Sequence, residues 1–139
     1  MTRQEQEDQA LADLQNQAAT DLERTELDGH WSAQLASKDV GVTDTYQRTA
    51  SGSHTFEAAD ILAEHQRLRD RLSPPYTIRL LYGPDAFGTD DTDGRALWYT
   101  FAVDNFDSKK DVEQFCKSAF PELGKDERGN QCFPRRLSR

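Results

Sequence analysis

The chain has 139 residues, of which 30% are charged and 35% are hydrophobic, and its formal net charge at pH 7 is -8. This length and composition predict one domain with an extension and a modest core. The negative charge argues against general nucleic-acid binding, which needs Lys and Arg to neutralise phosphates, and against docking on an anionic bilayer. No apolar run approaches the length of a membrane span or of a signal peptide's apolar segment. We therefore expect a cytoplasmic protein or the soluble part of a longer one, which would reach a membrane only through an anchor outside this sequence.

Residues 1–28 are expected to form an N-terminal helix or stalk that precedes the main domain at 29–139. The segment is rich in Gln and Glu, and its thin apolar seam at near-heptad spacing consists of Leu11, Leu14, Ala18 and Leu22. Two structures fit this pattern: a helix that is solvated on most faces, and a short coiled coil that pairs two chains as a dimer. The seam supplies only two or three apolar layers, fewer than a stable coiled coil normally needs.

The main domain alternates strands and helices, with apolar side chains at a period of 2 in the strands and of 3.6 in the helices. Strands are predicted at 31–37, 77–82, 98–103 and 132–137, and helices at 56–72 and 108–121. Residues 38–54 are interpreted as a long loop, mobile or covering a sheet edge, 83–94 as a hairpin connection, and 122–131 as a polar loop. This order predicts an α+β fold of the ferredoxin-like βαββαβ kind, with a four-stranded antiparallel sheet and two helices on one of its faces.

Local signals mark the ends of both helices. Ser108 and Asp111 resemble a capping box, and Thr55 is the expected N-cap of the first helix. Ser73-Pro74-Pro75 ends the first helix, because proline disfavours the helical conformation in the residue before it.

The face of the sheet opposite the two helices is predicted to be open and to bind a ligand. Side-chain alternation assigns to it Gln34, Thr77, Arg79, Leu81, Trp98, Thr100 and Ala102. The expected ligand-binding residues are Gln34, Ser37, Arg79, Trp98 and Thr100. An exposed Trp98 would stack on a sugar ring; alternatively, the N-terminal helix or the 38–54 loop covers this side chain and buries it.

Short motifs within about residues 29–138 resemble the SPOR domain, a small module that binds glycan strands of bacterial peptidoglycan. They are Trp31-Ser-Ala-Gln34-Leu-Ala-Ser37 and Val103-Asp-Asn-Phe106-Asp-Ser108, followed by Val112 and Phe115 on one helix face. Ala36 and Asp104-Asn105 stand where that family has Gly and Gly-Pro. The chain also resembles the extracellular C-terminal domains of actinobacterial membrane proteins, in Trp31 to Lys38, in Leu62-Ala-Glu-His65 and in its two cysteines.

The resemblance implies a non-catalytic cell-envelope binding module that reads peptidoglycan or another glycan. The alternative is a protein-interaction or regulatory domain of a membrane-anchored protein, whose partner would be an envelope protein.

Catalytic and metal-binding motifs are not found in the sequence, so we predict no enzyme activity, no metal and no cofactor. His30, His54 and His65 lack metal-ligand spacing, and His65 is expected to be a packed or capping residue. Ser51-Gly52-Ser53-His54 lacks the third group and the oxyanion site that a nucleophilic serine needs. Two acidic patterns suggest other chemistry, but each lacks something that the chemistry needs. Asp85 and Asp91 would be a carboxylate pair for glycoside hydrolysis, whose separation the sequence does not fix. Asp90, Asp91 and Asp93 form part of a calcium-loop pattern that lacks its terminal Glu.

Cys116 and Cys132 are the chain's two cysteines. Helix-on-sheet packing can bring them within the ~5.5 Å Cα separation of a disulfide. The bridge would close a loop of about 17 residues and stabilise the fold by on the order of 3 kcal/mol. Two reduced thiols, as in a cytoplasmic protein, are the alternative. The family resemblance supports the bridge, which would place the domain outside the cytoplasm, at the cell surface.

Overall fold

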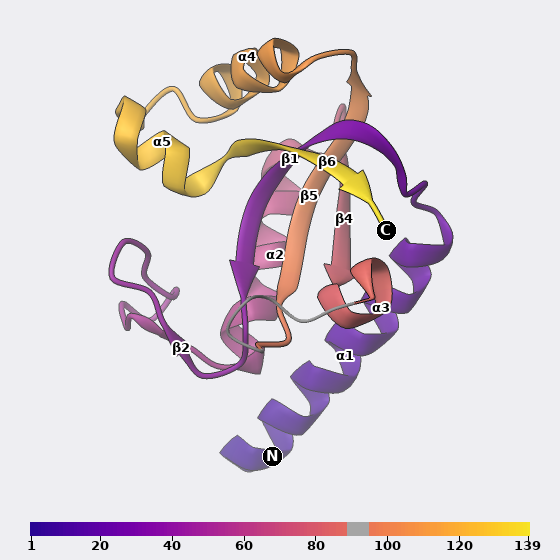
Figure 1. The fold of residues 1–139 in the computed structure, drawn as a ribbon. Helices are drawn as coiled ribbons and strands as arrows, with labels where there is room; N and C mark the ends of the chain where they lie inside the picture. The colour runs from indigo at the N-terminus through magenta and orange to yellow at the C-terminus, as the bar shows by residue number, and fades with distance from the viewer. Residues whose placement is uncertain (89–94) are drawn as a thin grey trace.

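The computed structural model describes residues 1–88 and 95–139 of the chain. It confirms an α+β fold with an N-terminal helix and a four-stranded antiparallel sheet, in which the strands lie in the order β4-β5-β1-β6 (Figure 1). The helices are α1 (Arg3–Glu23), α2 (Ala58–Leu72), α3 (Gly83–Phe87), α4 (Lys109–Ala119) and α5 (Lys125–Gln131). The strands are β1 (Asp28–Lys38), β2 (Val42–Thr43), β3 (Thr55–Phe56), β4 (Thr77–Tyr82), β5 (Trp98–Phe106) and β6 (Phe133–Ser138). No helix in the described part of the chain is long and apolar enough to cross a membrane.

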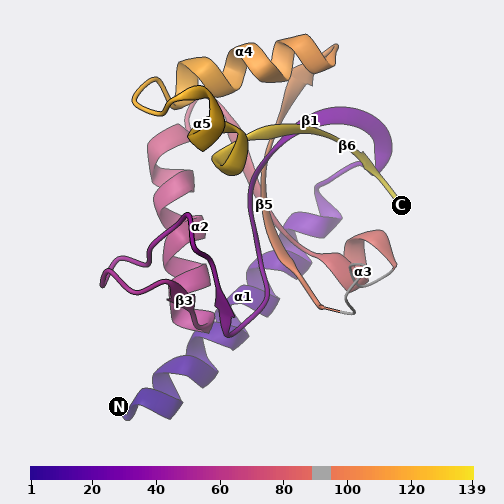
Figure 2. The ribbon, with the colours of Figure 1, turned by 60° about the vertical axis from the view of Figure 1, so that its left-hand side comes forward.

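Three segments that were expected to be loops or a plain connection contain short helices or strands. The 83–94 connection begins with the helix α3, which has Pro84 in its first turn and ends at Gly88 with φ 75°. The polar loop at 122–131 contains α5, and the 38–54 loop with its flanks forms the β2–β3 hairpin beside α2 (Figure 2).

One face of the sheet carries the main core. Helices α2 and α4 pack their apolar stripes against Ala33 and Leu35 of β1, Ile78 of β4 and Ala102 of β5. The two predicted helices therefore do cover the same face. Cys116 of α4 and Cys132 before β6 form a disulfide with a Cα separation of 5.7 Å, so the predicted bridge is confirmed.

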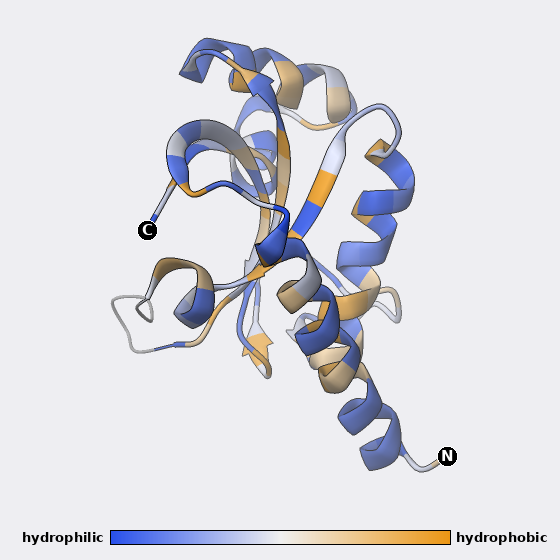
Figure 3. Ribbon diagram, turned by 90° about the vertical axis from the view of Figure 1, so that its right-hand side faces the viewer, coloured by the Kyte–Doolittle hydropathy of each residue, from blue (hydrophilic) through white to orange (hydrophobic). Residues whose placement is uncertain are grey.

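Helix α1 is part of this core, although Figure 3 shows that most of its ribbon is hydrophilic. Its side chains Leu14 and Ala18 are buried against Leu80 of β4 and against α2. The apolar seam that we interpreted as a stalk or coiled coil is thus largely used within the chain itself, and only Leu11 of the seam is exposed, at 36%.

A polar contact near the N-terminus of α1 fixes this helix to the start of α2. The Glu7 carboxylate accepts hydrogen bonds from the backbone N–H groups of Ala58 and Ala59, at 2.8 and 3.2 Å, at the start of α2. The N-cap of α2 is accordingly Glu57 rather than Thr55, which lies in β3. At the other end, α1 stops at Glu23, before the expected end at Asp28-Gly29.

The buried Asp21 takes the place of a strand partner along the edge of β4. Its Oδ2 accepts from the Leu80 N–H at 2.7 Å and from Arg69 Nη2 at 3.0 Å, and the same Nη2 donates to the Ile78 carbonyl at 2.8 Å. The edge of β4 is therefore covered by α1 and satisfied by side chains of α1 and α2.

Strand β5 faces the opposite way from the prediction. Its register with β4 pairs Ala102 with Ile78, Thr100 with Leu80 and Trp98 with Tyr82, and directly paired residues share a face of the sheet. Trp98, Thr100 and Ala102 consequently lie on the helix-covered face, and Tyr99, Phe101 and Val103 on the other. Both sets are largely apolar, so alternation alone could not distinguish them.

Candidate functional site

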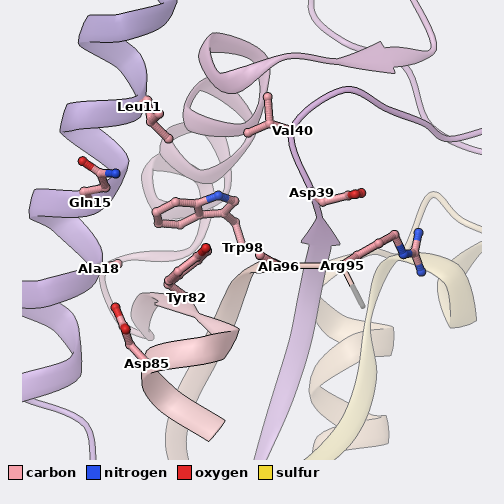
Figure 4. A pocket seen from close by; sticks show the side chains of 10 residues that line it. All are labelled: Leu11, Gln15, Ala18, Asp39, Val40, Tyr82, Asp85, Arg95, Ala96 and Trp98. Carbon is pink, nitrogen blue, oxygen red and sulfur yellow. The ribbon is translucent and has the colours of Figure 1, made fainter. Parts of the chain in front are cut away.

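A cleft of about 720 Å³ lies between α1 and the adjoining ends of β4 and β5 (Figure 4). Helix α1 supplies one wall, and the segment after β1, the start of α3 and the approach to β5 supply the rest. The lining residues are Leu11, Gln15, Ala18, Asp39, Val40, Tyr82, Asp85, Arg95, Ala96 and Trp98.

Two aromatic rings from neighbouring strands form the floor of this α1–β4 cleft. Tyr82 and Trp98 are cross-strand partners, and their ring centroids are 4.3 Å apart with an angle of 34° between the planes. Trp98 is only 5% exposed because it packs in the cluster that contains Leu14 and Ala18 of α1. Of the two alternatives considered for Trp98, the structure shows burial by the N-terminal helix, with part of the ring reaching the cleft.

Hydrogen-bonding groups surround the aromatic floor. In Figure 4, Gln15 and Asp85 lie on the α1 side of Trp98, and Asp39 and Arg95 lie beyond the indole on the opposite side. Within the described chain, Asp39 Oδ1 is buried and has no hydrogen-bond partner. A buried carboxylate oxygen normally accepts at least one hydrogen bond, so this atom is an acceptor that a ligand's hydroxyl or amide can satisfy.

The rim of the cleft adds exposed apolar surface. Leu11 is 36% exposed and Val40 is 45% exposed, which makes them two of the few large apolar side chains on the described surface. Aromatic and aliphatic walls with a few placed amide and carboxylate groups suit a ligand that has both an apolar face and hydroxyl groups.

The lining contains ionisable side chains of three kinds: carboxylate, phenol and guanidinium. It includes the carboxylates of Asp39 and Asp85, but no described lining residue is Ser, Thr, Cys, Lys or His. Across the described ranges, no three or more His, Cys, Asp and Glu side chains lie close enough to hold a metal ion.

The five residues predicted to bind a ligand do not come together. Gln34 and Ser37 line a small pocket of about 90 Å³ beside Lys38, whereas Arg79 lines a separate polar pocket of about 520 Å³. Trp98 lines the α1–β4 cleft, and Thr100 is buried on the helix-covered face. The prediction that Trp98 and Thr100 share the open face with Gln34 was therefore wrong, because β5 has the reverse orientation.

The face predicted to be open is largely filled by Arg135. Its guanidinium lies over the rings of Phe87, Tyr99 and Phe101, at 4.4, 4.9 and 5.7 Å from their centroids, and its Nη1 donates to Gln34 Oε1 at 3.0 Å. Gln34 is only 7% exposed as a result. The cation–π contacts of Arg135 and the helix α3 therefore cover the sheet face that was predicted to be open.

Thr100 has a structural partner in His65. The Thr100 hydroxyl and His65 Nδ1 are 2.9 Å apart, and both residues are buried. Burial, together with the positive charge of Arg69, lowers the pKa of His65 to about 4, so the ring is neutral near pH 7. The expectation that His65 is a packed residue is confirmed.

The remaining sequence candidates lie apart from the α1–β4 cleft or outside the described residues. His54 Nδ1 faces the backbone oxygens of Asp44 and Gln47, at 2.9 and 3.0 Å, and no hydrogen bond joins its ring to a serine in the described chain. The residues at 90, 91 and 93, considered above for a calcium loop, lie outside the described ranges, and Asp85 is in the first turn of α3.

Sequence reasoning missed most residues of the α1–β4 cleft. Leu11 and Gln15 belong to a helix that was expected to lie outside the domain, and Asp39 and Val40 to a loop. One signal was available: Tyr82 and Trp98 end and begin consecutive antiparallel strands, so a short connection would pair their aromatic rings across the two strands.

Comparison with protein-family models, with curated proteins and with solved structures gives no match for this chain. The resemblance to the SPOR domain stays a prediction.

Proposed function

We propose that this chain is a non-catalytic binding module of the cell envelope, which holds peptidoglycan or another glycan in the α1–β4 cleft. The observation that carries the proposal is the paired rings of Tyr82 and Trp98 at the floor of a cleft of about 720 Å³, with Gln15, Asp39 and Asp85 around them.

A sugar ring has the chemistry that these groups require. Its C–H face packs against an aromatic ring, and its hydroxyls both donate and accept hydrogen bonds. The unpartnered Asp39 Oδ1 takes a hydroxyl donor, and the Gln15 amide can serve as donor or acceptor. Because Trp98 is 5% exposed, the half-buried Tyr82 provides most of the stacking surface.

Two broader features support a module of this kind. The sheet order β4-β5-β1-β6, with α2 and α4 on one face, supports a ferredoxin-like βαββαβ core with additions, as in the SPOR-like interpretation. The disulfide between Cys116 and Cys132 supports a location outside the cytoplasm, because such bonds form and persist in oxidising compartments.

A protein-interaction or regulatory domain is the second candidate. It is favoured by the exposed Leu11 and Val40 at the rim, since apolar side chains gathered at one cleft are typical of a surface that contacts another protein.

Tryptophan fluorescence can test the glycan proposal directly. The chain has two tryptophans, so a Trp31→Phe variant reports only on Trp98. Titration with soluble peptidoglycan fragments and with chito-oligosaccharides should change the Trp98 emission to saturation. On this background, Gln15→Ala and Asp85→Asn should each weaken binding about fivefold, the effect of losing roughly one hydrogen bond.

The matched control is Asn16→Ala. Asn16 carries the same kind of amide as Gln15, follows it directly on α1, is exposed and does not line the α1–β4 cleft. Binding that is equally reduced by Gln15→Ala and Asn16→Ala would place the glycan elsewhere. No emission change with any fragment, together with unchanged retention of the Gln15→Ala variant on purified cell-wall sacculi, would exclude the proposal.

A further inference from the structure

The charge of this acidic chain is unevenly distributed. Residues 109–139 contain eight Lys and Arg against five Asp and Glu, whereas residues 1–108 contain nine against twenty. The positive segment forms α4, α5 and β6, and in Figures 1 and 2 α4 and α5 lie side by side at one end of the sheet. Within this segment, residues 109–131 hold five Lys and Arg and five Asp and Glu, and the excess comes from Arg135, Arg136 and Arg139 at the C-terminus.

A second cleft, of about 520 Å³, lies between α4, α5 and the start of β6, and we refer to it as the disulfide cleft. Its charged lining residues are Lys117 of α4, Lys125 and Arg128 of α5, and a single carboxylate, Glu113. Within the described residues, none of the three cations has a carboxylate oxygen within 4.0 Å. The Arg128 guanidinium makes one long hydrogen bond, of 3.4 Å, to the Leu123 carbonyl.

Three other cations of the fold, unlike those of the disulfide cleft, form structural ion pairs within the described chain. Lys38, Arg69 and Arg71 each form an ion pair within the chain, at 2.8, 3.0 and 2.7 Å. Lys117, Lys125 and Arg128 line one cavity and have no such partner among the described residues, so a bound anion would supply one.

The rest of the wall is apolar. It contains the disulfide of Cys116 and Cys132, Pro134, and Phe133, whose side chain is 38% exposed. The ligand that fits this lining therefore has an apolar group next to its negative charge.

The bridge holds the two charged walls together. Cys116 immediately precedes Lys117 on α4, and the Cys132 N–H donates to the Arg128 carbonyl at 2.8 Å at the end of α5. The disulfide thus fixes the position of α5, and with it Lys125 and Arg128, relative to Lys117.

We infer that the disulfide cleft is an anion-binding site for the phosphate or carboxylate of a ligand that also carries an apolar group. Lys117, Lys125 and Arg128 bind the oxyanion, and Phe133 and Pro134 contact the apolar part. This inference does not depend on the glycan proposed for the α1–β4 cleft, which has other residues and a different charge.

The test is a titration of the disulfide-bonded protein, followed by NMR amide shifts, with inorganic phosphate, phenyl phosphate and benzoate at low ionic strength. Phenyl phosphate or benzoate should saturate the shifts of α4 and α5, and phenyl phosphate should bind more tightly than inorganic phosphate. Lys117→Gln and Arg128→Gln should each weaken the binding about fivefold, and Glu113→Gln should strengthen it.

The matched control is Lys110→Gln, which removes an exposed cation of α4 that does not line the disulfide cleft. It should leave the affinity unchanged. Equal weakening by Lys110→Gln and Lys117→Gln would mean that the net charge alone attracts anions and would overturn the site. So would weaker binding of Glu113→Gln, or the absence of saturable shifts with all three anions.

Discussion

His65 is a buried histidine that the fold keeps neutral. Its ring lies between α2 and β5, with Nδ1 against Thr100, and its Nε2 has no partner among the described residues. The charges that act on it are Arg69 of its own helix, which lowers its pKa, and Asp21 of α1, which raises it; desolvation is the largest effect.

This pKa makes the stability of the protein depend on pH. With a pKa lowered from 6.5 to about 4, His65 is protonated in the unfolded chain but not in the folded one between these two values. The contribution of the neutral His65 ring to the free energy of unfolding is fully present above pH 6.5. This contribution is lost as the pH falls to about 4, and the loss is roughly 3 kcal/mol in total. Urea unfolding at a series of pH values should show this loss, added to the effects of carboxylates.

A His65→Gln variant separates the histidine from the carboxylates, because it cannot be protonated. The difference in unfolding free energy between the original protein and this variant should shrink as the pH is lowered from 7 to 4. A difference that stays constant would contradict the neutral, buried ring.

Lys38 and Glu64 form a buried ion pair that joins β1 to α2. Lys38 Nζ lies 2.8 Å from Glu64 Oε1, 2.6 Å from Gln47 Oε1 and 4.4 Å from the centroid of the Phe56 ring. Glu64→Gln would leave a buried charge without its counter-ion, so we expect a loss of about 3 kcal/mol in the free energy of unfolding.

Asp70→Asn on the exposed side of the same helix is the control, with an expected change below about 0.5 kcal/mol. The double variant Lys38→Met/Glu64→Leu should recover most of the stability lost in Glu64→Gln, because it removes both charges. A Glu64→Gln variant as stable as the control would show that Lys38 is adequately solvated.

Asp21 adds a polar attachment of helix α1 to the edge of β4, beside the apolar packing of Leu14 and Ala18. Asp21→Ala removes the acceptor for the Leu80 N–H and the counter-ion of Arg69, so about 3 kcal/mol of stability should be lost. Amide hydrogen exchange at Leu80 should become faster. Asp13→Ala, an exposed position on α1, should change neither quantity beyond the few tenths of a kcal/mol of a helix side-chain pair.

The elements that could be predicted from the sequence are those with one apolar side. In α2, Ile61, Leu68 and Leu72 recur at helical spacing, and all three are buried. In β5 the same reasoning failed because Trp98 and Tyr99 are both large and apolar, and the choice of face came from pairing with β4. The role of Asp21 had no signal, since a carboxylate on a polar helix normally faces solvent.

The candidate sites were less predictable than the fold because each combines distant segments. Gln15 and Trp98 are brought together only when α1 docks on the sheet, and Lys117 and Arg128 only through the disulfide. Local periodicity carries no information about such contacts. The cysteine pair was the exception, since a chain with two cysteines offers a single intramolecular pairing.

The disulfide should contribute strongly to the stability of the chain as a whole. It closes a loop with a sequence separation of 16 residues and ties α4 to the start of β6. Reduction should lower the free energy of unfolding by on the order of 3 kcal/mol, as expected for a loop of this length. Urea unfolding with and without reductant measures the effect; coincident transitions would show that α4 and β6 hold together without the bridge.

The cover that α1 provides for β4 has a consequence for self-association. A chain that starts at residue 29 would lose Asp21 and expose the Leu80 N–H, together with Trp98 and the apolar side chains beneath the helix. An uncovered strand edge beside apolar surface is a template on which another copy can add its own strand. We expect light scattering of the shortened chain to show concentration-dependent growth of β-sheet oligomers, whereas the full chain shows none.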